Sequence, residues 1–442
     1  MSNSSTFILM FGLNPDDYTN EEVEPIKIDK GWIINLKQSK DASKRICPHC
    51  KSIHSQVKDY HVVEYSISDN PGERNYVRIR KVRFICMNCR ATYTNALKGI
   101  VENTNLTERT LQLIKVSFTE MLTFEQIGRT YGLSDARIIQ LFDELVPFVP
   151  RRLFPKYLCI DEVKMETEYG KYIVILSDYE TGEIIDVIKS RQDAYLRRYF
   201  NEIPIKEREN VKYLISDMYD EYESIRKTFF PKALHLIDMF HIVKQLTEAT
   251  NRLRVRAMNN ILYEGSFGHE FMKSKWKLFL IRANEIPDKE YTSKTREKTY
   301  TYPNMVQYCL NECLDLYKAY SALQDLYQYK EHKTYTTAIA FIDFIINKLR
   351  GSENELLDKV ADTYKKWKNE IAQTFSHKYK EDKYFTNAVA EGNNSKFGTL
   401  VKIAYGFHNF ERTRKRFLLI KSYNYHKWKW GAAFARYSPL YI

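Results

Sequence analysis

The sequence predicts an α/β protein whose mixed sheet with flanking helices is interrupted by a helical insertion and follows two small domains. Short apolar segments rich in Ile, Val, Leu and Tyr, separated by polar turns, predict five strands at 157–163, 172–178, 183–189, 212–217 and 233–238. Strand signals nearly vanish from about 240 to 380, where the pattern is helical. Two CxxC motifs and a helix-rich stretch precede the sheet. A chain of 442 residues is long enough for about two to four domains.

The net charge indicates which binding partners this protein favours, and the distribution of apolar residues indicates its cellular compartment. Lys and Arg number 68 against 56 Asp and Glu, which gives a net charge of +12. Such an excess favours a polyanion, most commonly nucleic acid, although a basic soluble protein without such a partner has the same balance. No run approaches the ~18–20 apolar residues of a membrane span, and the apolar FILMFGL near the start lacks the flanks of a secretory signal. The sequence therefore predicts a cytoplasmic protein whose seven cysteines form no disulfide framework.

Residues 1–44 form an N-terminal segment without recognisable chemistry, and residues 45–92 carry two cysteine pairs that predict a zinc ribbon. The pairs are Cys47-Pro-His-Cys50 and Cys86-Met-Asn-Cys89, separated by 35 residues. Each CxxC places two thiolates on one ion, and two such knuckles complete a tetrahedral site. The intervening HVVEYSI and VRIRKVRFIC alternate like strands. A redox pair and chance spacing are the alternatives, and His49 or His54 offers a substitute ligand.

Residues 93–150 have the helical spacing of a helix-turn-helix DNA-binding domain. In TFEQIGRTYGLSDARIIQLFDEL, two apolar helical stretches flank Gly132, which we expect at the turn. Ser134 and Asp135 are natural N-caps for the second helix. The exposed residues that this helix would bring to the base edges are Ala136, Arg137 and Gln140. Similar turns also occur in ordinary helical bundles, which is the alternative.

Two aspartates close apolar runs of the predicted sheet, and a glutamate lies far downstream. Asp161 follows YLCI, Asp217 follows VKYLIS, and Glu391 lies in the helical segment NAVAEGNNSKFGTL. A carboxylate at the end of a buried strand is unfavourable unless its charge is paired or holds a metal. Three such groups can hold a pair of hard cations, and a metal pair promotes in-line displacement at phosphorus. We therefore predict that adjacent strands bring Asp161 and Asp217 together and that a helix carries Glu391 across that edge.

Other interpretations of the acidic residues stay open. Strand-end aspartates often cap turns or helices. Asp238 with His241, in HLIDMFHIVKQ, also follows a predicted strand and competes with Glu391. Further candidates for ligands, or for groups that support ligands, are Glu162, Asp178 and Asp220.

A basic stretch accompanies Glu391. Asn394, Ser395 and Lys402 share the helical face of Glu391. Residues 391–430 hold nine Lys or Arg against two acids, and four of these cations lie together in NFERTRKRF. They are Arg412, Arg414, Lys415 and Arg416. We predict that this face contacts a nucleic-acid backbone, whereas basic helical faces in general are more often only solvated.

The order of these motifs resembles that of one protein family. A zinc ribbon, a helix-turn-helix, IDEV, SDMYDEY, DMFHIVKQ, a helical insertion and NAVAEGNNSKFGTLVKIAYGFHNFERTRKR follow one another over roughly residues 45–425. This order is similar to that of the DDE transposases of bacterial insertion sequences, specifically the ISL-three family. The resemblance implies a ribonuclease H-like core at 151–245 and 381–430, split by the insertion at 246–380 and followed by a tail at 431–442.

The resemblance also implies an activity. Asp161, Asp217 and Glu391 would bind two Mg²⁺ (or Mn²⁺) ions. The protein would bind the terminal inverted repeats of its element as double-stranded DNA, cleave strands and transfer them to target DNA, as a homodimer or larger assembly. Gly398 departs from the family, because many DDE enzymes carry Lys or Arg there, so Lys396 or Lys402 would supply that charge. The alternatives are a catalytically silent regulator derived from a transposase and a structure-selective nuclease with the same core.

Overall fold

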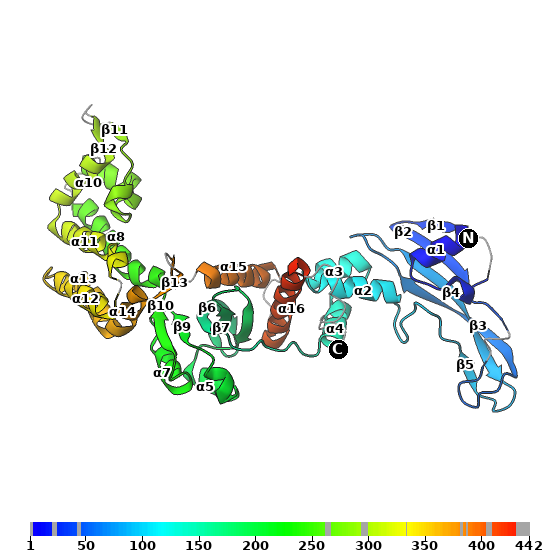
Figure 1. The fold of residues 1–442 in the computed structure, drawn as a ribbon. Coiled ribbons are helices and arrows are strands. Elements are labelled where there is room, and N and C mark those ends of the chain that lie inside the picture. The colour runs from blue at the N-terminus through cyan, green and yellow to red at the C-terminus, as the bar shows by residue number, and fades with distance from the viewer. Residues whose placement is uncertain are drawn as a thin grey trace. The chain divides into compact units, whose positions relative to one another are not determined.

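The chain folds into two compact units. The computed structural model describes residues 3–19, 24–41, 46–260, 267–292, 299–332, 334–380, 383–385, 388–403 and 409–429. The first unit comprises Met1–Pro150 and Thr399–Ile442, and the second comprises Arg151–Gly398 (Figure 1). Among the described helices, none has the length and hydropathy that crossing a bilayer requires.

A five-stranded sheet forms the N-terminal part of the first unit. Its strands are β1 (Pro25–Ile28), β2 (Gly31–Lys37), β3 (Ser55–Ser66), β4 (Tyr76–Cys86) and β5 (Thr92–Thr94). The order is β1-β2-β4-β3 with β5 beside β4, and only the β2–β4 pair is parallel. Because two of these strands precede residue 45, the N-terminal segment predicted at 1–44 shares one sheet with the cysteine-bearing strands.

This sheet carries two separate hydrophobic cores on its opposite faces. Side chains alternate along a strand. On β4, Val77 and Ile79 join one core, whereas Val82 joins the other together with Cys47 and Tyr93. Since positions 79 and 82 differ by an odd number of residues, the two cores lie on opposite faces. Each face is therefore covered by a core along only part of β4.

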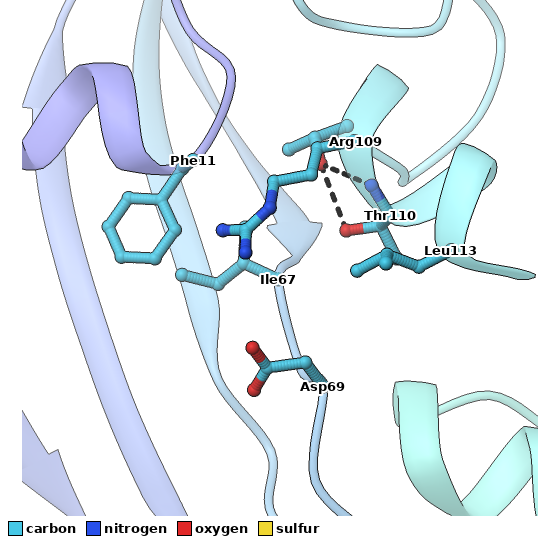
Figure 2. A pocket seen from close by; sticks show the side chains of 7 residues that line it. Phe11, Ile67, Asp69, Arg109, Thr110 and Leu113 are labelled. Carbon is cyan, nitrogen blue, oxygen red and sulfur yellow. Dashed lines mark hydrogen bonds between the residues drawn. The ribbon is translucent and has the colours of Figure 1, made fainter. Parts of the chain in front are cut away.

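Helix α1 (Asn3–Met10) packs against the core that contains Val77 and Ile79. Helix α2 (Glu108–Ser117) contacts the C-terminal end of α1. The Arg109 side chain of α2 donates to the Met10 carbonyl. Figure 2 shows the small pocket beside this contact, which Asp69 and Arg109 both line. A neighbouring apolar cavity of about 340 Å³ is lined by residues that include Phe7 and Trp32. No sequence motif predicts either pocket.

Well-capped helices follow the sheet. Helix α3 (Phe124–Tyr131) begins with a capping box between Thr123 and Gln126. Gly132 ends α3 in the left-handed region at φ 67°, and Ser134 caps α4 (Asp135–Leu145) by accepting the Arg137 N–H. The turn glycine and the Ser134 cap therefore lie where the sequence predicts them. Helix α16 (Phe410–Lys429) belongs to the same unit and lies beside α3 and α4 in Figure 1.

The second unit is built on a mixed five-stranded sheet at the predicted positions. Its strands are β6 (Tyr157–Thr167), β7 (Gly170–Asp178), β8 (Ile184–Ile188), β9 (Tyr213–Ser216) and β10 (Leu234–Ile237). In the order β10-β9-β6-β7-β8, the three strands β10, β9 and β6 are parallel, and β7 is antiparallel to both its neighbours. The predicted mixed sheet is confirmed, and it is compatible with a ribonuclease H-like core.

Both faces of this sheet are covered. The helices between the strands are α5 (Asp193–Asn201), α6 (Ile205–Arg208) and α7 (Asp220–Phe229). Leu196 of α5 and Ile225 of α7 are buried with Ile160 of β6 on one face. On the other face, Phe385 packs against Cys159, next to the ribbon of β13 (Lys378–Lys380) and β14 (Lys383–Tyr384).

A helical insertion follows β10, as predicted. Its helices are α8 (Met239–Asn260), α9 (Phe267–Ser274), α10 (Tyr302–Asn311), α11 (Leu314–Leu326), α12 (Tyr335–Arg350), α13 (Glu355–Lys366) and α14 (Lys368–Ser376). They share one apolar core, and α14 is fixed to β10 because the Ile237 N–H donates to Thr374 Oγ1 at 2.8 Å. Within this helical region, β11 (Glu290–Thr292) and β12 (Thr299–Thr301) form an antiparallel pair.

The end of the chain is divided between the two units. Helix α15 (Ala388–Ile403) begins in the second unit, whose boundary lies at Gly398, and α16 belongs to the first unit. This grouping differs from the prediction that residues 381–430 together complete the core. The physical reason is burial, because Thr413, Arg416 and Phe417 of α16 lie inside the first unit.

Candidate functional site

Three aspartates lie level with one another where the parallel pairing of β6, β9 and β10 ends. Strands β6 and β9 pair Cys159 with Ile215, and β9 and β10 pair Ser216 with Ile237. Continuing these registers sets Asp161 level with Asp217 and Asp217 level with Asp238. All three residues therefore lie at one edge of the parallel part of the sheet.

Asp161 does not end its own strand. Strand β6 runs on to Thr167 because it pairs with β7 beyond the point where β9 stops. The sequence-based expectation that Asp161 and Asp217 both end adjacent strands is thus corrected for β6. The consequence for the site is small, since Asp161 lies where the parallel pairing with β9 ends.

Asp161 is held by two hydrogen bonds. Its Oδ1 accepts the Glu162 N–H at 2.7 Å, and its Oδ2 accepts Nδ2 of Asn394, from α15, at 2.8 Å. The Asn393 side chain donates to the Gly182 carbonyl at 3.1 Å, so α15 is bonded both to β6 and to the turn between β7 and β8. Glu391 lies on α15 one turn before Asn394, and its side chain is outside the described residues.

Burial and neighbouring acids disfavour charge on these carboxyls. Burial raises the pKa of Asp161, and burial together with the charges of Glu162 and Asp161 raises the pKa of Asp217 to about 7. Oδ1 of Asp217 and Oδ1 of Asn394 are buried and accept no hydrogen bond from a described residue. Buried oxygens without donors, beside acids whose ionisation is disfavoured, fit a hard divalent cation, because such ions bind oxygen ligands.

Asp238 has the contacts of a helix cap and the position of a ligand. It is fully buried, and its Oδ1 accepts the Phe240 N–H at 3.1 Å at the start of α8. Its Oδ2 lies 3.8 Å from Nε2 of His241. Because Asp238 lies next to Asp217 in the strand register, Asp238 and Glu391 are both candidates for the third metal ligand.

The other acidic candidates have different surroundings. Glu162 accepts Arg191 at 2.6 Å and the Tyr222 hydroxyl at 2.9 Å. Asp178 caps a turn by accepting the Glu180 N–H, and Asp220 pairs with Lys366. Arg191, Tyr222 and the Asn394–Asp161 contact carry no sequence signal, because each depends on tertiary packing.

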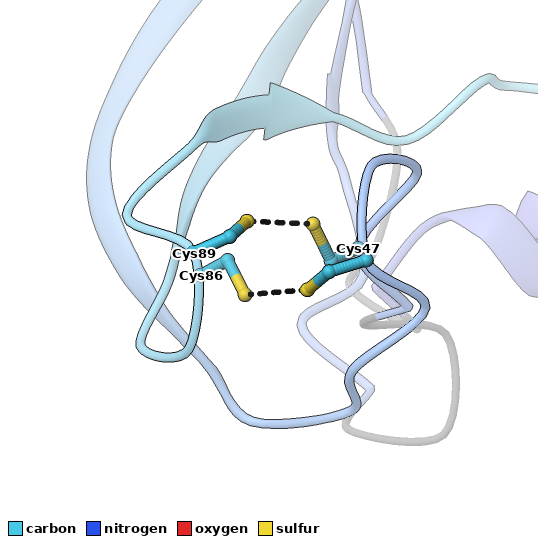
Figure 3. A group of neighbouring side chains, drawn as sticks. Cys47, Cys86 and Cys89 are labelled. Carbon is cyan, nitrogen blue, oxygen red and sulfur yellow. Dashed lines mark hydrogen bonds between the residues drawn. The ribbon is translucent and has the colours of Figure 1, made fainter.

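The four cysteines converge at one end of the first sheet (Figure 3). Sγ of Cys47 lies 3.6 Å from Sγ of Cys89, and Sγ of Cys50 lies 3.6 Å from Sγ of Cys86. Sulfurs bound at about 2.3 Å to one zinc ion would be about 3.8 Å apart in a tetrahedron. The spacing of the thiols therefore fits the predicted zinc site.

The two cysteine knuckles have the same backbone geometry. The Lys51 N–H donates to the Cys47 carbonyl and the Arg90 N–H to the Cys86 carbonyl, both at 2.9 Å. Lys51 and Arg90 adopt φ of 60° and 61°, the left-handed conformation that closes such a turn. The backbone N–H groups of Cys89 and Asn88 lower the pKa of the Cys86 thiol to about 6, which favours the metal-binding thiolate.

Known proteins resemble this chain over the part that carries the acidic residues. The model of a transposase family, the DDE transposases of the ISL-three type, matches residues 158–417, more than half of the chain. This chain belongs to the ISL-three family of DDE transposases. The chain is also similar to the transposase for insertion sequence element IS1001 from Bordetella parapertussis, with 21% identity over 272 residues. That similarity covers 58% of this chain and 64% of the relative, less than two thirds of the relative's length.

In this family member, the residues predicted to contact DNA have unequal exposure. On α4, Arg137 is partly exposed, whereas Gln140 is exposed and donates to Glu144 at 2.8 Å. Lys396 and Lys402 are exposed on α15. These four residues keep surface that a nucleic acid can reach.

The basic run on α16 bonds within the first unit. Arg412 forms an ion pair with Asp143 of α4 at 2.7 Å. Lys415 donates to the Val146 carbonyl at 2.9 Å, and Arg414 donates to the Val149 carbonyl at 3.3 Å. These acceptors lie at or beyond the C-terminal end of α4, where positive charge is favoured. These bonds join α16 to α4, and because Arg412, Arg414 and Lys415 stay partly exposed, their contact with a nucleic-acid backbone stays a prediction.

Arg416 is fully buried. Its Nη2 donates to the Glu120 and Leu122 carbonyls at 3.1 and 2.9 Å, just beyond the end of α2. Its guanidinium lies 5.0 Å from the ring centre of Phe124, and burial lowers the pKa of Arg416 to about 10. A guanidinium without exposed surface does not contact a phosphate, so the expectation of DNA binding by Arg416 is corrected to a structural role.

Arg416→Met is expected to destabilise the first unit by about 3 kcal/mol, because the carbonyls that follow α2 lose their buried charged donor while the side-chain volume is nearly kept. Urea unfolding of the full chain, followed by tryptophan and tyrosine fluorescence, measures the change. Arg414→Met is the matched control and should change stability by less than about 1 kcal/mol, since Arg414 is partly exposed. Equal stability of the two variants would contradict the structural role.

Proposed function

We propose that this protein is the transposase of an insertion sequence, which cleaves DNA at the terminal inverted repeats and transfers the ends to target DNA. The observation that carries the proposal is the position of Asp161 level with Asp217, just beyond the last parallel pair of β6 and β9, where burial raises both pKa values. Two Mg²⁺ or Mn²⁺ ions are the proposed catalytic cofactors, with Glu391 as the third ligand. One Zn²⁺ is proposed for the cysteine site.

In this mechanism, the chain's own residues hold and orient the reacting groups. Asp161, Asp217 and Glu391 would hold the metal pair, which would supply activation of a water or 3′-hydroxyl and charge stabilisation of the leaving oxygen. The strand register fixes the spacing of Asp161 and Asp217. Asn394 orients the Asp161 carboxylate through its hydrogen bond to Oδ2, as groups behind metal ligands commonly do.

Glu391 is preferred to Asp238 as the third ligand because of the position of α15. Residues one turn apart share a helix face, and Asn394, one turn after Glu391, reaches Asp161. Asp238 is proposed to cap α8 and to support the site from the adjacent strand.

End recognition is assigned to the first unit. The zinc ribbon would orient the protein on duplex DNA, and α4 would enter the major groove with Arg137 and Gln140 at base edges. Lys396 and Lys402 would contact phosphates and supply the positive charge that many DDE enzymes carry at the position occupied here by Gly398. Because two element ends must be joined, we propose a homodimer or a larger assembly on DNA.

The test is a cleavage assay with the purified full chain and a duplex that carries the repeats flanking its gene. Strand cutting at the repeat ends that requires Mg²⁺ or Mn²⁺ is expected, and Glu391→Gln should abolish it while Asp238→Asn retains measurable cutting. Binding to the repeats without cutting would favour the silent regulator. Cutting of branched DNA without regard to the repeats would favour the structure-selective nuclease.

A further inference from the structure

One face of the first sheet carries cations gathered around an exposed tyrosine. Arg80 of β4 lies opposite Lys37 of β2 and Val62 of β3, so these residues share a face. The Arg80 guanidinium lies 4.3 Å from the ring centre of Tyr60, and Nζ of Lys40 lies 5.1 Å from the same ring. Lys37, Lys40, Tyr60 and Arg80 are all exposed. We call these four residues the β4 basic face.

The other two arginines of β4 are neutralised by acids on β3. Arg78 pairs with Glu64, and Arg83 pairs with Asp59. Among the described residues, Arg80 has no such salt bridge, and its cross-strand neighbour on β2 is a second cation. In the part of the chain that the structure describes, Arg80 is thus the arginine of β4 whose charge no acid offsets, and Arg80 is exposed.

The two cores of the sheet explain why this face is open. Val82, two positions beyond Arg80 on β4, joins the core near the cysteines, whereas Ile79 joins the core on the opposite face. Arg80 thus points to the part of its face that no core covers. The tyrosine ring under the guanidinium restricts its motion and directs its donors outward, which suits binding of phosphate.

We propose that the β4 basic face binds the phosphate backbone of duplex DNA. The inference rests on the proposed function, since it assigns part of the DNA affinity of a transposase to this sheet, apart from the base-reading helix α4. Each phosphate contact adds about 0.9 to the slope of log affinity against log salt. At 0.15 M salt, one contact corresponds to about fivefold in affinity and three contacts to about a hundredfold.

The test compares two single substitutions that remove one positive charge each. Arg80→Ala removes the centre of the basic face, whereas Lys81→Ala removes the next residue of β4, which lies on the opposite face over the Tyr65 ring. The full chain, loaded with zinc, is titrated into a fluorescein-labelled 30-base-pair duplex of arbitrary sequence at several NaCl concentrations. Fluorescence anisotropy gives the affinity and its salt slope.

Arg80→Ala is expected to bind about fivefold more weakly with a salt slope lower by about one, and Lys81→Ala to bind like the wild type. The triple replacement of Lys37, Lys40 and Arg80 by Ala should lose about a hundredfold. Equal losses in the two single variants would overturn the proposal, because net charge alone would then explain them. Zinc content shows that each variant is folded, and Arg80→Gln replaces Arg80→Ala if zinc is lost.

The two proposals can fail separately. A wild-type protein that cuts repeat-bearing duplexes, together with an Arg80→Ala variant of unchanged affinity, overturns the basic face and leaves the transposase proposal standing. A wild-type protein that binds neither the arbitrary duplex nor the repeats overturns both.

Discussion

Asp217→Asn is expected to abolish metal-dependent DNA cleavage and to make the metal-free protein more stable at pH 8. Loss of a metal ligand removes several kcal/mol of transition-state stabilisation, about a thousandfold or more in rate. The gain in stability follows from the pKa of Asp217, which rises from 3.8 in an unperturbed carboxyl to about 7 in the folded protein. The neutral amide resembles the protonated form that folding favours.

The sign of the pH effect follows from this raised pKa. Below about pH 4 the carboxyl is protonated in both the folded and the unfolded state, so it does not affect stability. Between about pH 4 and pH 7 the unfolded chain is ionised while the folded carboxyl stays protonated, so the wild type loses stability relative to the variant as pH rises. Above pH 7 the folded carboxyl ionises as well, and the loss levels off. The free energy of unfolding of Asp217→Asn should exceed that of the wild type by at most about 4 kcal/mol at pH 8 and by about 2 kcal/mol at pH 5.

Thermal and urea unfolding in EDTA at the two pH values measure this difference. Added MnCl₂ should stabilise the wild type and leave Asp217→Asn nearly unchanged. Asp178→Asn is the matched control, since Asp178 ends β7 but caps a turn, and it should keep both cleavage and the response to manganese. An Asp217→Asn variant that still transfers strands would remove Asp217 from the metal set.

Replacing Cys47 and Cys86 together with Ser is expected to remove zinc and to unfold the cysteine end of the first sheet. The core at that end is small and includes both cysteines themselves, so metal ligation supplies much of its stability. Under the proposed function, binding to terminal repeats should fall by at least about a hundredfold, because the element proposed to position the protein on DNA is lost. The sheet of the second unit has its own core and should stay folded.

Elemental analysis and hydrogen exchange of the purified full chain check this result. The wild type should hold one zinc per chain, and the double variant none, with fast exchange confined to β5 and the two knuckles. Cys313→Ser provides the control, since this partly exposed cysteine lies in the second unit. A wild-type protein without zinc would refute the metal site.

The sheet and the neighbouring carboxylates could be predicted because their signals are local. Five apolar segments between polar turns define the strands, and the parallel order then brings Asp161 and Asp217 together without further information. The cysteine pairs were predictable for the same reason, since each CxxC turn is closed by its own backbone hydrogen bond. Glu391 as a ligand stays a prediction.

Long-range packing explains what could not be predicted. Whether a basic helical face meets solvent or protein depends on a partner far away in the sequence, and Arg412 finds Asp143 at a separation of 269 residues. Long-range pairing also explains why β1 and β2 share a sheet with the cysteine-bearing strands. Strand β2 pairs in parallel with β4, which lies in a separate segment of the sequence. The sequence shows that such residues are basic or apolar, but it does not show which residues they contact in the folded protein.

The burial of Arg416 between α2 and α3 has a consequence for biosynthesis. A nascent chain that has emerged only as far as residue 150 lacks α16, whose side chains satisfy carbonyls left open after α2 and α4. The first unit therefore becomes complete only after the second has left the ribosome. Prematurely terminated products would carry an unfinished first unit, so this unit would be less stable in them than in the full-length protein.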